Sequence, residues 1–190
     1  MKAYILTEGP ADVAFLQRII EGKVKAPLEF VAAGGKSAVT SMAQSLIVSR
    51  RAPVAVVLDA DTLDPQLVGE QERIYSDRLG SYSHGVPFRF FLAVPEMEHL
   101  LFESPGLLDS ELGIQVSKHD AGEANVQPRQ VLERLIRRSS FKNRQEFFGN
   151  LSDGAVKELA RLPLVDALIR FLRRPDRLEA GHRSPANYVA

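Results

Sequence analysis

Short apolar runs alternate with amphipathic segments over the first hundred residues of the chain. Four runs rich in β-branched and aromatic residues predict strands at residues 3–7, 28–32, 54–58 and 88–94. The segments between them carry apolar residues at helical spacing. They predict one helix from Pro10 to a stop at Gly22, a second from an N-cap at Ser37 to about residue 49, and a third over 65–79.

This alternation is typical of an α/β fold, because helices of ten to fifteen residues between strands make right-handed crossovers. We therefore predict a mostly parallel four-stranded sheet flanked by helices. A loop with Gly80, Gly85 and Pro87 is expected before the fourth strand, and residues 96–103 look helical. Strand signals fade after residue 105, and short helices are predicted at 130–138, 144–148, 154–162 and 164–173.

Three parts of the chain are expected from these signals. Residues 1–104 form the α/β domain, 105–174 form a helical extension packed on it, and 175–190 form a tail. The chain has 190 residues, of which 45% are hydrophobic, so it has ample apolar material for a core. The N-terminus lacks the pattern of a signal peptide, and no apolar run approaches the ~20 residues of a membrane span, so we expect a cytoplasmic protein without membrane contact.

The absence of cysteine and the distribution of charge narrow the chemistry. No disulfide scaffold, zinc finger or thiol nucleophile is possible, so any metal must be held by oxygen or imidazole ligands. Residues 1–128 hold 11 basic and 17 acidic side chains, net −6, whereas residues 129–190 hold 13 and 7, net +6. A basic part attracts phosphate backbones. Arginines that only solvate the outer faces of terminal helices would explain the same charge, and the charge alone leaves both explanations open.

Acidic residues follow three of the predicted strands, at the edge where ligands bind in a parallel α/β sheet. Glu8 and Asp12 follow the first strand, Asp59 and Asp61 the third, and the fourth is followed by Glu96 and Glu98. Carboxylates gathered at one edge repel each other unless a cation neutralises them, and Mg²⁺ prefers oxygen ligands. Five or six carboxylates suffice for two ions ~3.5–4 Å apart, the arrangement that cleaves phosphodiesters.

Several of these carboxylates also have a purely structural interpretation. Asp12 has the position of a helix N-terminal charge, Asp61 or Asp64 that of a cap for the next helix, and Glu96 that of a solvated first-turn residue. Glu8 has no such role, because a carboxylate between a buried strand and Gly-Pro contributes nothing to packing. Glu8 is therefore the strongest functional candidate among the acidic residues.

The segments that carry these carboxylates resemble the Toprim family, most closely the Toprim domains of OLD-type (overcoming lysogenization defect) nucleases. Residues 5–12 (ILTEGPAD) resemble the family's EGxxD motif, residues 57–61 (VLDAD) its DxD motif, and residues 92–101 (LAVPEMEHLL) the proline-then-glutamate helix of the OLD type. The resemblance covers about residues 3–103 and implies a Toprim-like Rossmannoid fold. It also implies a general acid/base role for Glu8, Mg²⁺ or Mn²⁺ binding by Asp59 and Asp61, and ion sites completed by Asp12 and Glu98.

The resemblance also bears on partners. OLD-type nucleases carry an ATPase domain ahead of Toprim, and this chain has none, so a separately encoded ATPase is a possible partner. A topoisomerase would need further domains that bear its tyrosine, and a primase would need a cysteine-based zinc domain. Neither activity is expected from this chain.

Basic residues supply candidate contacts to a substrate. Residues 34–37 (GGKS) lack the full loop of a Walker A motif, and they predict a turn in which Gly35 and Lys36 contact a phosphate or serve only as the turn. Arg134, Arg137 and Arg138 share one helical face by their spacing and are expected to follow a nucleic-acid backbone. The basic residues considered on or beside the C-terminal helices are Arg129, Arg134, Arg137, Arg138, Arg144, Arg170, Arg173 and Arg174. The four histidines show no paired metal-ligand spacing.

The sequence thus predicts a Mg²⁺- or Mn²⁺-dependent nuclease that cleaves phosphodiester bonds in nucleic acid, with DNA favoured. Two ions are expected to do the chemistry, held by the carboxylates named above. A different class of function stays open, in which the domain is a non-catalytic module that binds nucleic acid or a partner ATPase. A third is phosphoryl chemistry on a small nucleotide.

Overall fold

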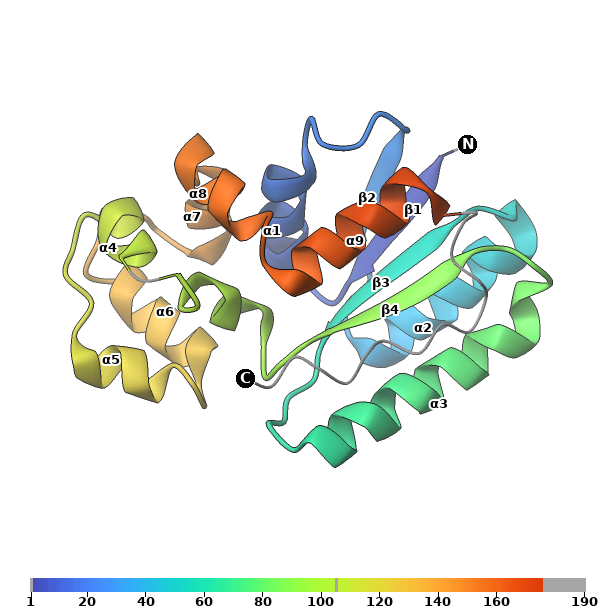
Figure 1. Cartoon of the computed structure of the whole chain (residues 1–190), viewed down its shortest axis with the longest axis horizontal. Coiled ribbons are helices and arrows are strands. Elements are labelled where there is room, and N and C mark those ends of the chain that lie inside the picture. Colours follow the sequence, from blue (N-terminus) through green and yellow to red (C-terminus); the bar gives the residue numbers. More distant parts are fainter. Residues whose placement is uncertain (1, 105, 176–190) are drawn as a thin grey trace.

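The computed structural model describes residues 2–104 and 106–175 of the chain, and Figure 1 shows its elements. The first part contains β1 (Ala3–Thr7), α1 (Pro10–Ile20), β2 (Leu28–Ala32), α2 (Lys36–Ser45), a π-helical turn η1 (Leu46–Arg50), β3 (Val54–Asp59), α3 (Pro65–Ser83), β4 (Phe88–Ala93) and a 3₁₀ turn η2 (Met97–Leu101). The second part contains α4 (Leu107–Leu112), α5 (Lys118–Glu123), α6 (Pro128–Ile136), α7 (Arg144–Gly149), α8 (Asp153–Leu159) and α9 (Pro163–Arg173).

The four strands form one parallel sheet in the order β2-β1-β3-β4. In β1, Tyr4 is paired with Glu29 on one side and with Val54 on the other. The strand order therefore reverses between β1 and β3, and the carboxyl ends of two strands that flank such a reversal are where α/β sheets bind ligands. The predicted parallel four-stranded α/β fold with a helical C-terminal part is confirmed.

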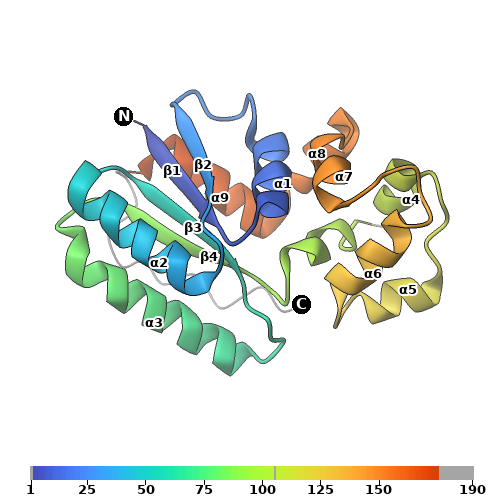
Figure 2. The same ribbon diagram turned by 180° about the vertical axis from the view of Figure 1, so that it is seen from behind.

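Alternate residues of each strand enter two separate apolar cores, as a pleated strand requires. Ala3 and Ile5 of β1 belong to the core under α1 and α9, whereas Tyr4 and Leu6 belong to the core under α2 and α3. Figure 1 shows α1 and α9 in front of the sheet, and Figure 2, from behind, shows α2 and α3 on the opposite face. Both faces are covered, which is why β3 is buried along its whole length.

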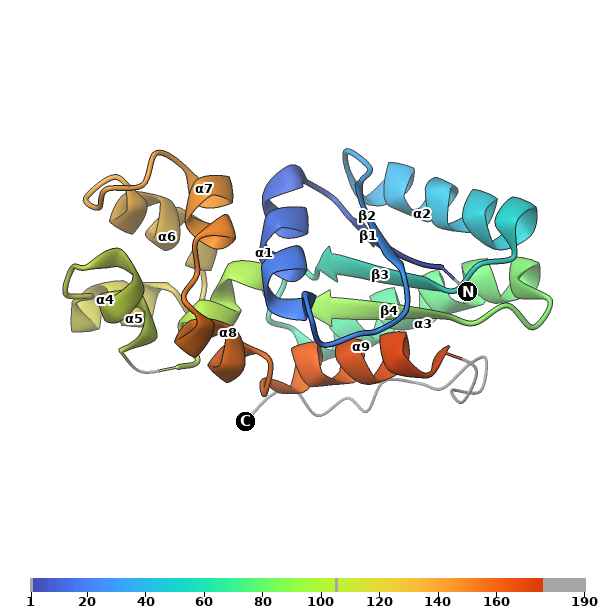
Figure 3. The ribbon, with the colours of Figure 1, turned by 90° about the horizontal axis from the view of Figure 1, so that it is seen from above.

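The helices that follow the sheet share its first core. Phe148 of α7 packs on Phe15 of α1 with ring centroids 4.8 Å apart, and Phe171 of α9 packs on Phe91 of β4 at 6.1 Å. Figure 3 shows α4 to α7 beyond the end of the sheet toward which the strand arrows point. The division at residue 104 stays a prediction, and the expected tail at 175–190 lies, apart from Pro175, outside the described residues.

Three local predictions need correction. Gly35, not Ser37, is the N-cap of α2, because its φ of 124° makes a turn that side-chain-bearing residues disfavour. Gly80 lies inside α3 and not in a loop, because α3 extends to Ser83. Leu79 and Ser83, on either side of Gly80, are both buried in this last part of the helix. The helices α4 and α5 were not predicted, because each has only six residues and shows too little periodicity.

No helix within the described ranges is both long enough and apolar enough to cross a bilayer. The nineteen-residue α3 is the longest of these helices, and it is polar along most of its length.

Candidate active site

A cleft of about 760 Å³ opens at the carboxyl ends of β1 and β3, against α6 and the N-terminal end of α7. It therefore lies at the reversal of the strand order, where one wall comes from the sheet and the other from the helical part. The residues that line it are Glu8, Gly9, Pro10, Ala11, Asp12, Gly35, Asp59, Asp61, Arg129, Glu133, Ile136, Arg137, Lys142, Asn143, Arg144 and Gln145.

Glu8 leaves β1 at the floor of this cleft and is partly buried. Its Oε1 is buried and has no hydrogen-bond partner among the described residues. Burial raises the pKa of the Glu8 carboxyl, and the positive charge of Lys36 offsets part of the rise. A buried carboxylate oxygen without a donor costs free energy, so this oxygen indicates a cation or a proton that the protein itself does not supply.

Asp12 has the structural role considered from the sequence, at the N-terminal end of α1, and it also lies at the cleft. Its Oδ2 accepts a hydrogen bond from the backbone N–H of Gly9 at 3.0 Å, which caps the first turn of α1. The same carboxyl is 9% exposed and lines the cleft. Burial raises the pKa of Asp12, and the N–H of Gly9 opposes that rise.

Asp59 and Asp61 both line the cleft but have different partners. Asp59 Oδ1 accepts from the backbone N–H of Met97 at 2.8 Å, and its Oδ2 accepts from the Arg129 guanidinium. Burial, with the charge of Glu98 as the next cause, raises the pKa of Asp59 to about 7. Asp61 has a positive φ of 54°, and its carboxylate lies 2.6 Å from the Lys36 ammonium. The turn at Asp61, directly after β3, brings both aspartates to the cleft.

Glu98 lies on η2 next to the cleft and is 1% exposed. Its Oε1 accepts from two guanidinium groups, those of Arg129 and Arg144, while its Oε2 is buried without a partner among the described residues. Arg144 also contacts Glu133 at 3.3 Å. Glu96, expected to be solvated, accepts a hydrogen bond from the backbone N–H of Arg129 at 3.0 Å.

The sheet end of the cleft carries an excess of negative charge. Six carboxylates meet there: Glu8, Asp12, Asp59, Asp61, Glu96 and Glu98. Three cationic side chains contact them: Lys36, Arg129 and Arg144. Glu133 also lines the cleft and pairs with Arg144, so seven carboxylates face three cationic side chains, a formal excess of four negative charges before the more distant Arg137 and Lys142 are counted. The donor set, all carboxylate oxygen, fits a hard divalent cation such as Mg²⁺ or Mn²⁺.

Gly35 and three basic residues lie at the rim or wall of the cleft. Gly35 lines it, and Lys36 follows directly and is held by Asp61. Burial lowers the pKa of Lys36, but the hydrogen bond and charge of Asp61 outweigh burial and raise it overall. Arg137 and Lys142 line the opposite side and are exposed. This arrangement places positive charge on both sides of the acidic floor.

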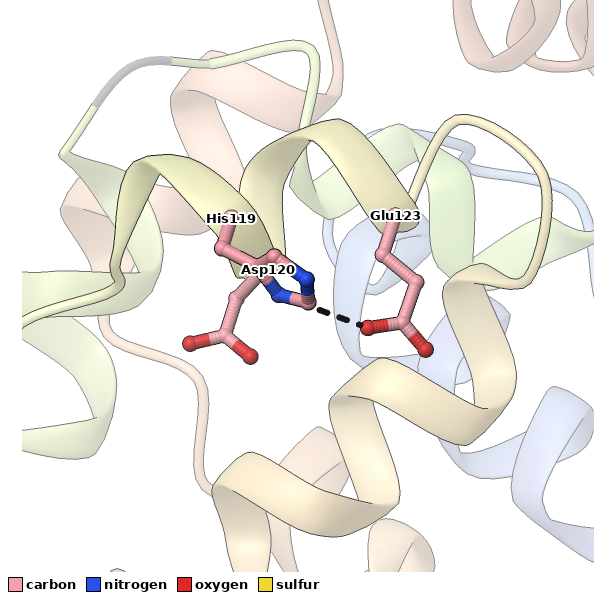
Figure 4. Close-up of side chains that lie close together, drawn as sticks. All are labelled: His119, Asp120 and Glu123. Carbon is pink, nitrogen blue, oxygen red and sulfur yellow. Dashed lines mark ion pairs between the residues drawn. The ribbon is translucent and has the colours of Figure 1, made fainter.

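The other two predicted substrate contacts lie elsewhere. Arg134 pairs with Asp120 and Glu123 at 2.7 Å each, and Arg138 lies 3.7 Å from Asp120. Neither is among the residues that line the cleft. The cluster of Asp120, Glu123 and His119 on α5 has its ligand atoms within 4.8 Å of one another, as drawn in Figure 4. Because Arg134 already pairs with both carboxylates, a cation there would have to compete with it.

Comparison with protein-family models finds no match, and no curated protein matches the chain. Among solved structures, the chain is similar to the C-terminal region of the OLD protein of Xanthomonas campestris pv. campestris. The two share 15% identity with a TM-score of 0.43, over 89% of this chain and 96% of that chain. With values this low, only the geometry and motifs of this chain's own residues support a function.

The structural role of Arg129 and Arg144 was not predicted. The sequence analysis grouped both with arginines that follow a nucleic acid or solvate a helix, whereas both turn inward to Glu98. Each lies near the beginning of its helix, at the second position of α6 and the first of α7. The excess of basic residues after 128 was the available signal, but it does not say which arginines face the acidic edge.

Proposed function

We propose that this protein is a divalent-metal-dependent phosphodiesterase that acts on nucleic acid, with Mg²⁺ or Mn²⁺ as its cofactor. The observation that carries the proposal is the meeting of carboxylates from two strand exits in one cleft, with Glu98 from a third exit beside it and with raised pKa values for Glu8, Asp12 and Asp59. Burial is the largest cause of all three raised pKa values, so these carboxylates are withdrawn from water without enough positive charge to offset that loss. The Toprim-like motifs of the sequence support the same function and favour DNA as the substrate.

The carboxylates of the cleft have different proposed roles, which depend on their positions. Glu8, Asp12 and Asp61 line the cleft and would hold the cation, with Asp59 and Glu98 beside them. A divalent cation bound there lowers the pKa of a water molecule and offsets the charge of a phosphate. Glu8 would serve as the proton acceptor, because its Oε1 has no hydrogen-bond partner among the described residues, whereas both oxygens of Asp59 are occupied.

Positive side chains at the rim would hold the nucleic-acid backbone. Arg137 and Lys142 are exposed on the helical wall, and Lys36 lies on the sheet wall. Groups on both walls suit a strand that passes across the cleft with a phosphate over the acidic floor. A separately encoded ATPase, as the OLD-type resemblance implies, would act by delivering or remodelling that strand.

The test is nicking of supercoiled plasmid DNA at graded Mg²⁺ and Mn²⁺ concentrations. We expect metal-dependent nicking by the wild-type protein and a loss of at least about 100-fold in Glu8→Gln and Asp59→Asn, the scale of a missing general base. Glu158→Gln and Asp77→Asn are matched controls, because they remove the same kinds of charge from exposed positions on α8 and α3. These controls should cleave at the wild-type rate.

Two other results would contradict the proposal. Binding of DNA without nicking at any metal concentration would favour the non-catalytic module, which contacts nucleic acid or an ATPase without cutting. Release of phosphate from mononucleotides, with no action on plasmid, would assign the cleft to small nucleotides.

A further inference from the structure

Arg129 contacts three carboxylates of the acidic edge, and its own side chain is 36% exposed. Its guanidinium contacts Asp59, lies 3.4 Å from Glu98 and 3.7 Å from Glu96. Its backbone N–H donates to the other oxygen of Glu96 at 3.0 Å. The residue is therefore held at both its backbone and its side-chain end. Burial lowers the pKa of Arg129, but the charges of Glu98, Asp59 and Glu96 outweigh burial and raise it.

Hydrogen bonds within the protein use three of the four carboxylate oxygens of Asp59 and Glu98, and only Glu98 Oε2, which is buried, has no partner among the described residues. Asp59 has one oxygen bound to the Met97 N–H and the other to Arg129. Glu98 has one oxygen shared by Arg129 and Arg144, and Arg144 is itself held by Glu133. A planar guanidinium with five donors matches several carboxylates at once and stays charged at any working pH. A hydrated divalent ion would have to displace it from partly and fully buried partners.

The opposite side of the cleft is less firmly closed. Glu8 Oε1 has no hydrogen-bond partner among the described residues. The ion pair between Asp61 and Lys36 has side chains 58% and 27% exposed, and pairs of this kind in contact with water hold weakly. Asp12 lies between the two sides and makes its hydrogen bond with the backbone of Gly9. Lys36 can therefore leave Asp61 for a phosphate more easily than Arg129 can leave Asp59.

We propose that Arg129 is the resident second cation of this cleft, so that the protein binds one divalent ion and not two. The single ion is held on the side of Glu8, Asp12 and Asp61, while Arg129 occupies Asp59 and, together with Arg144, Glu98. This inference rests on the proposed function and changes one part of it, because the carboxylates alone suffice for two ions. Arg129 is thus a positioning residue that fixes the geometry and the charge of the carboxylates beside the ion.

The test is the stoichiometry of Mn²⁺ binding, measured by titration with MnCl₂ and electron paramagnetic resonance of the free ion. We expect one Mn²⁺ per wild-type chain and two per chain in Arg129→Gln, because Asp59 then loses its guanidinium partner and Glu98 keeps only Arg144. Arg170→Gln is the matched control, since Arg170 is exposed on α9 and pairs with Asp166. This control should bind one ion, and Arg129→Lys, which keeps a positive charge, should also bind one.

Each alternative result is informative. Two ions per wild-type chain would overturn the inference but leave a metal-dependent function intact, whereas no ion would overturn the proposed function itself. One ion in both the wild type and Arg129→Gln would show that Arg129 does not exclude a second. If Arg129→Gln does not fold, Asp59→Asn decides the question. The inference expects one ion at unchanged affinity in that variant, because Asp59 is held by Arg129 and is not a ligand, and at least tenfold weaker binding would overturn it.

Discussion

Replacing Asp59 by asparagine should stabilise the metal-free protein at alkaline pH, although the residue belongs to the proposed active site. The pKa of Asp59 rises from 3.8 to about 7 in the folded protein, where the carboxyl is 5% exposed. At about 1.4 kcal/mol per pH unit, keeping this group ionised in the folded state costs about 4 kcal/mol. An asparagine has nearly the same shape, can accept the Met97 N–H and never ionises.

The sign of the pH dependence of stability depends on whether the folded or the unfolded state binds the Asp59 proton more strongly. The folded protein retains the Asp59 proton up to about pH 7, whereas the unfolded chain releases it near pH 3.8. The folding free energy contributed by this group is therefore lost as the pH rises between these values, and the loss is complete above pH 7. Between pH 5 and pH 8 the penalty grows by about 3 kcal/mol, and movement of neighbouring groups makes this an upper value.

The assay is urea unfolding of the wild type and Asp59→Asn at pH 5 and pH 8 with EDTA present. The difference in unfolding free energy should move by up to about 3 kcal/mol in favour of the variant at pH 8. Asp77→Asn, on an exposed face of α3, should show no such shift. A difference that is equal at both pH values, or a variant less stable than the wild type at pH 8, would refute the electrostatic reasoning.

Three further predictions concern the scaffold and are measured by urea denaturation. Leu79→Ala should cost about 2–5 kcal/mol because Leu79 is fully buried, whereas Ile74→Ala, 54% exposed on the same helix, should cost under about 0.5 kcal/mol; equal costs would contradict the register of α3. Asp64→Ala should cost about 1 kcal/mol by removing the α3 cap at Gln66 N–H, and Asp64→Asn should restore most of it. Phe148→Ala should cost about 3–5 kcal/mol, and a smaller loss would mean that α7 contributes little to the core.

The sheet was predictable because each strand and each crossover leaves a local pattern. Val54 to Leu58 is a continuous apolar run because both of its faces are buried, and Asp59 follows where the strand reaches the edge. The parallel arrangement then brings Glu8 to the same edge. Local periodicity and chain topology were sufficient for this half of the cleft.

The helical wall was not predictable in the same way, because its contacts join residues far apart in the chain. Arg129 meets Asp59 across 70 positions and Arg144 meets Glu98 across 46. Arg134 and Arg137 share a helical face by spacing, yet one pairs with Glu123 and the other lines the cleft. A difference of three residues on a short helix changes which partner is reached, and spacing alone does not identify the partner.

The opposite net charges of the two parts of the chain have an internal explanation. Carboxylates gather at one edge of the sheet, where they repel one another. Arg129 and Arg144, on helices after residue 128, pair with carboxylates at that same edge. Arg134 likewise pairs with the acidic α5, so part of the excess positive charge is used within the fold and is not free for a nucleic acid. The exposed Arg137 and Lys142 remain at the cleft. The salt dependence of DNA binding should therefore reflect a few phosphate contacts, well below what the net charge of the C-terminal part suggests.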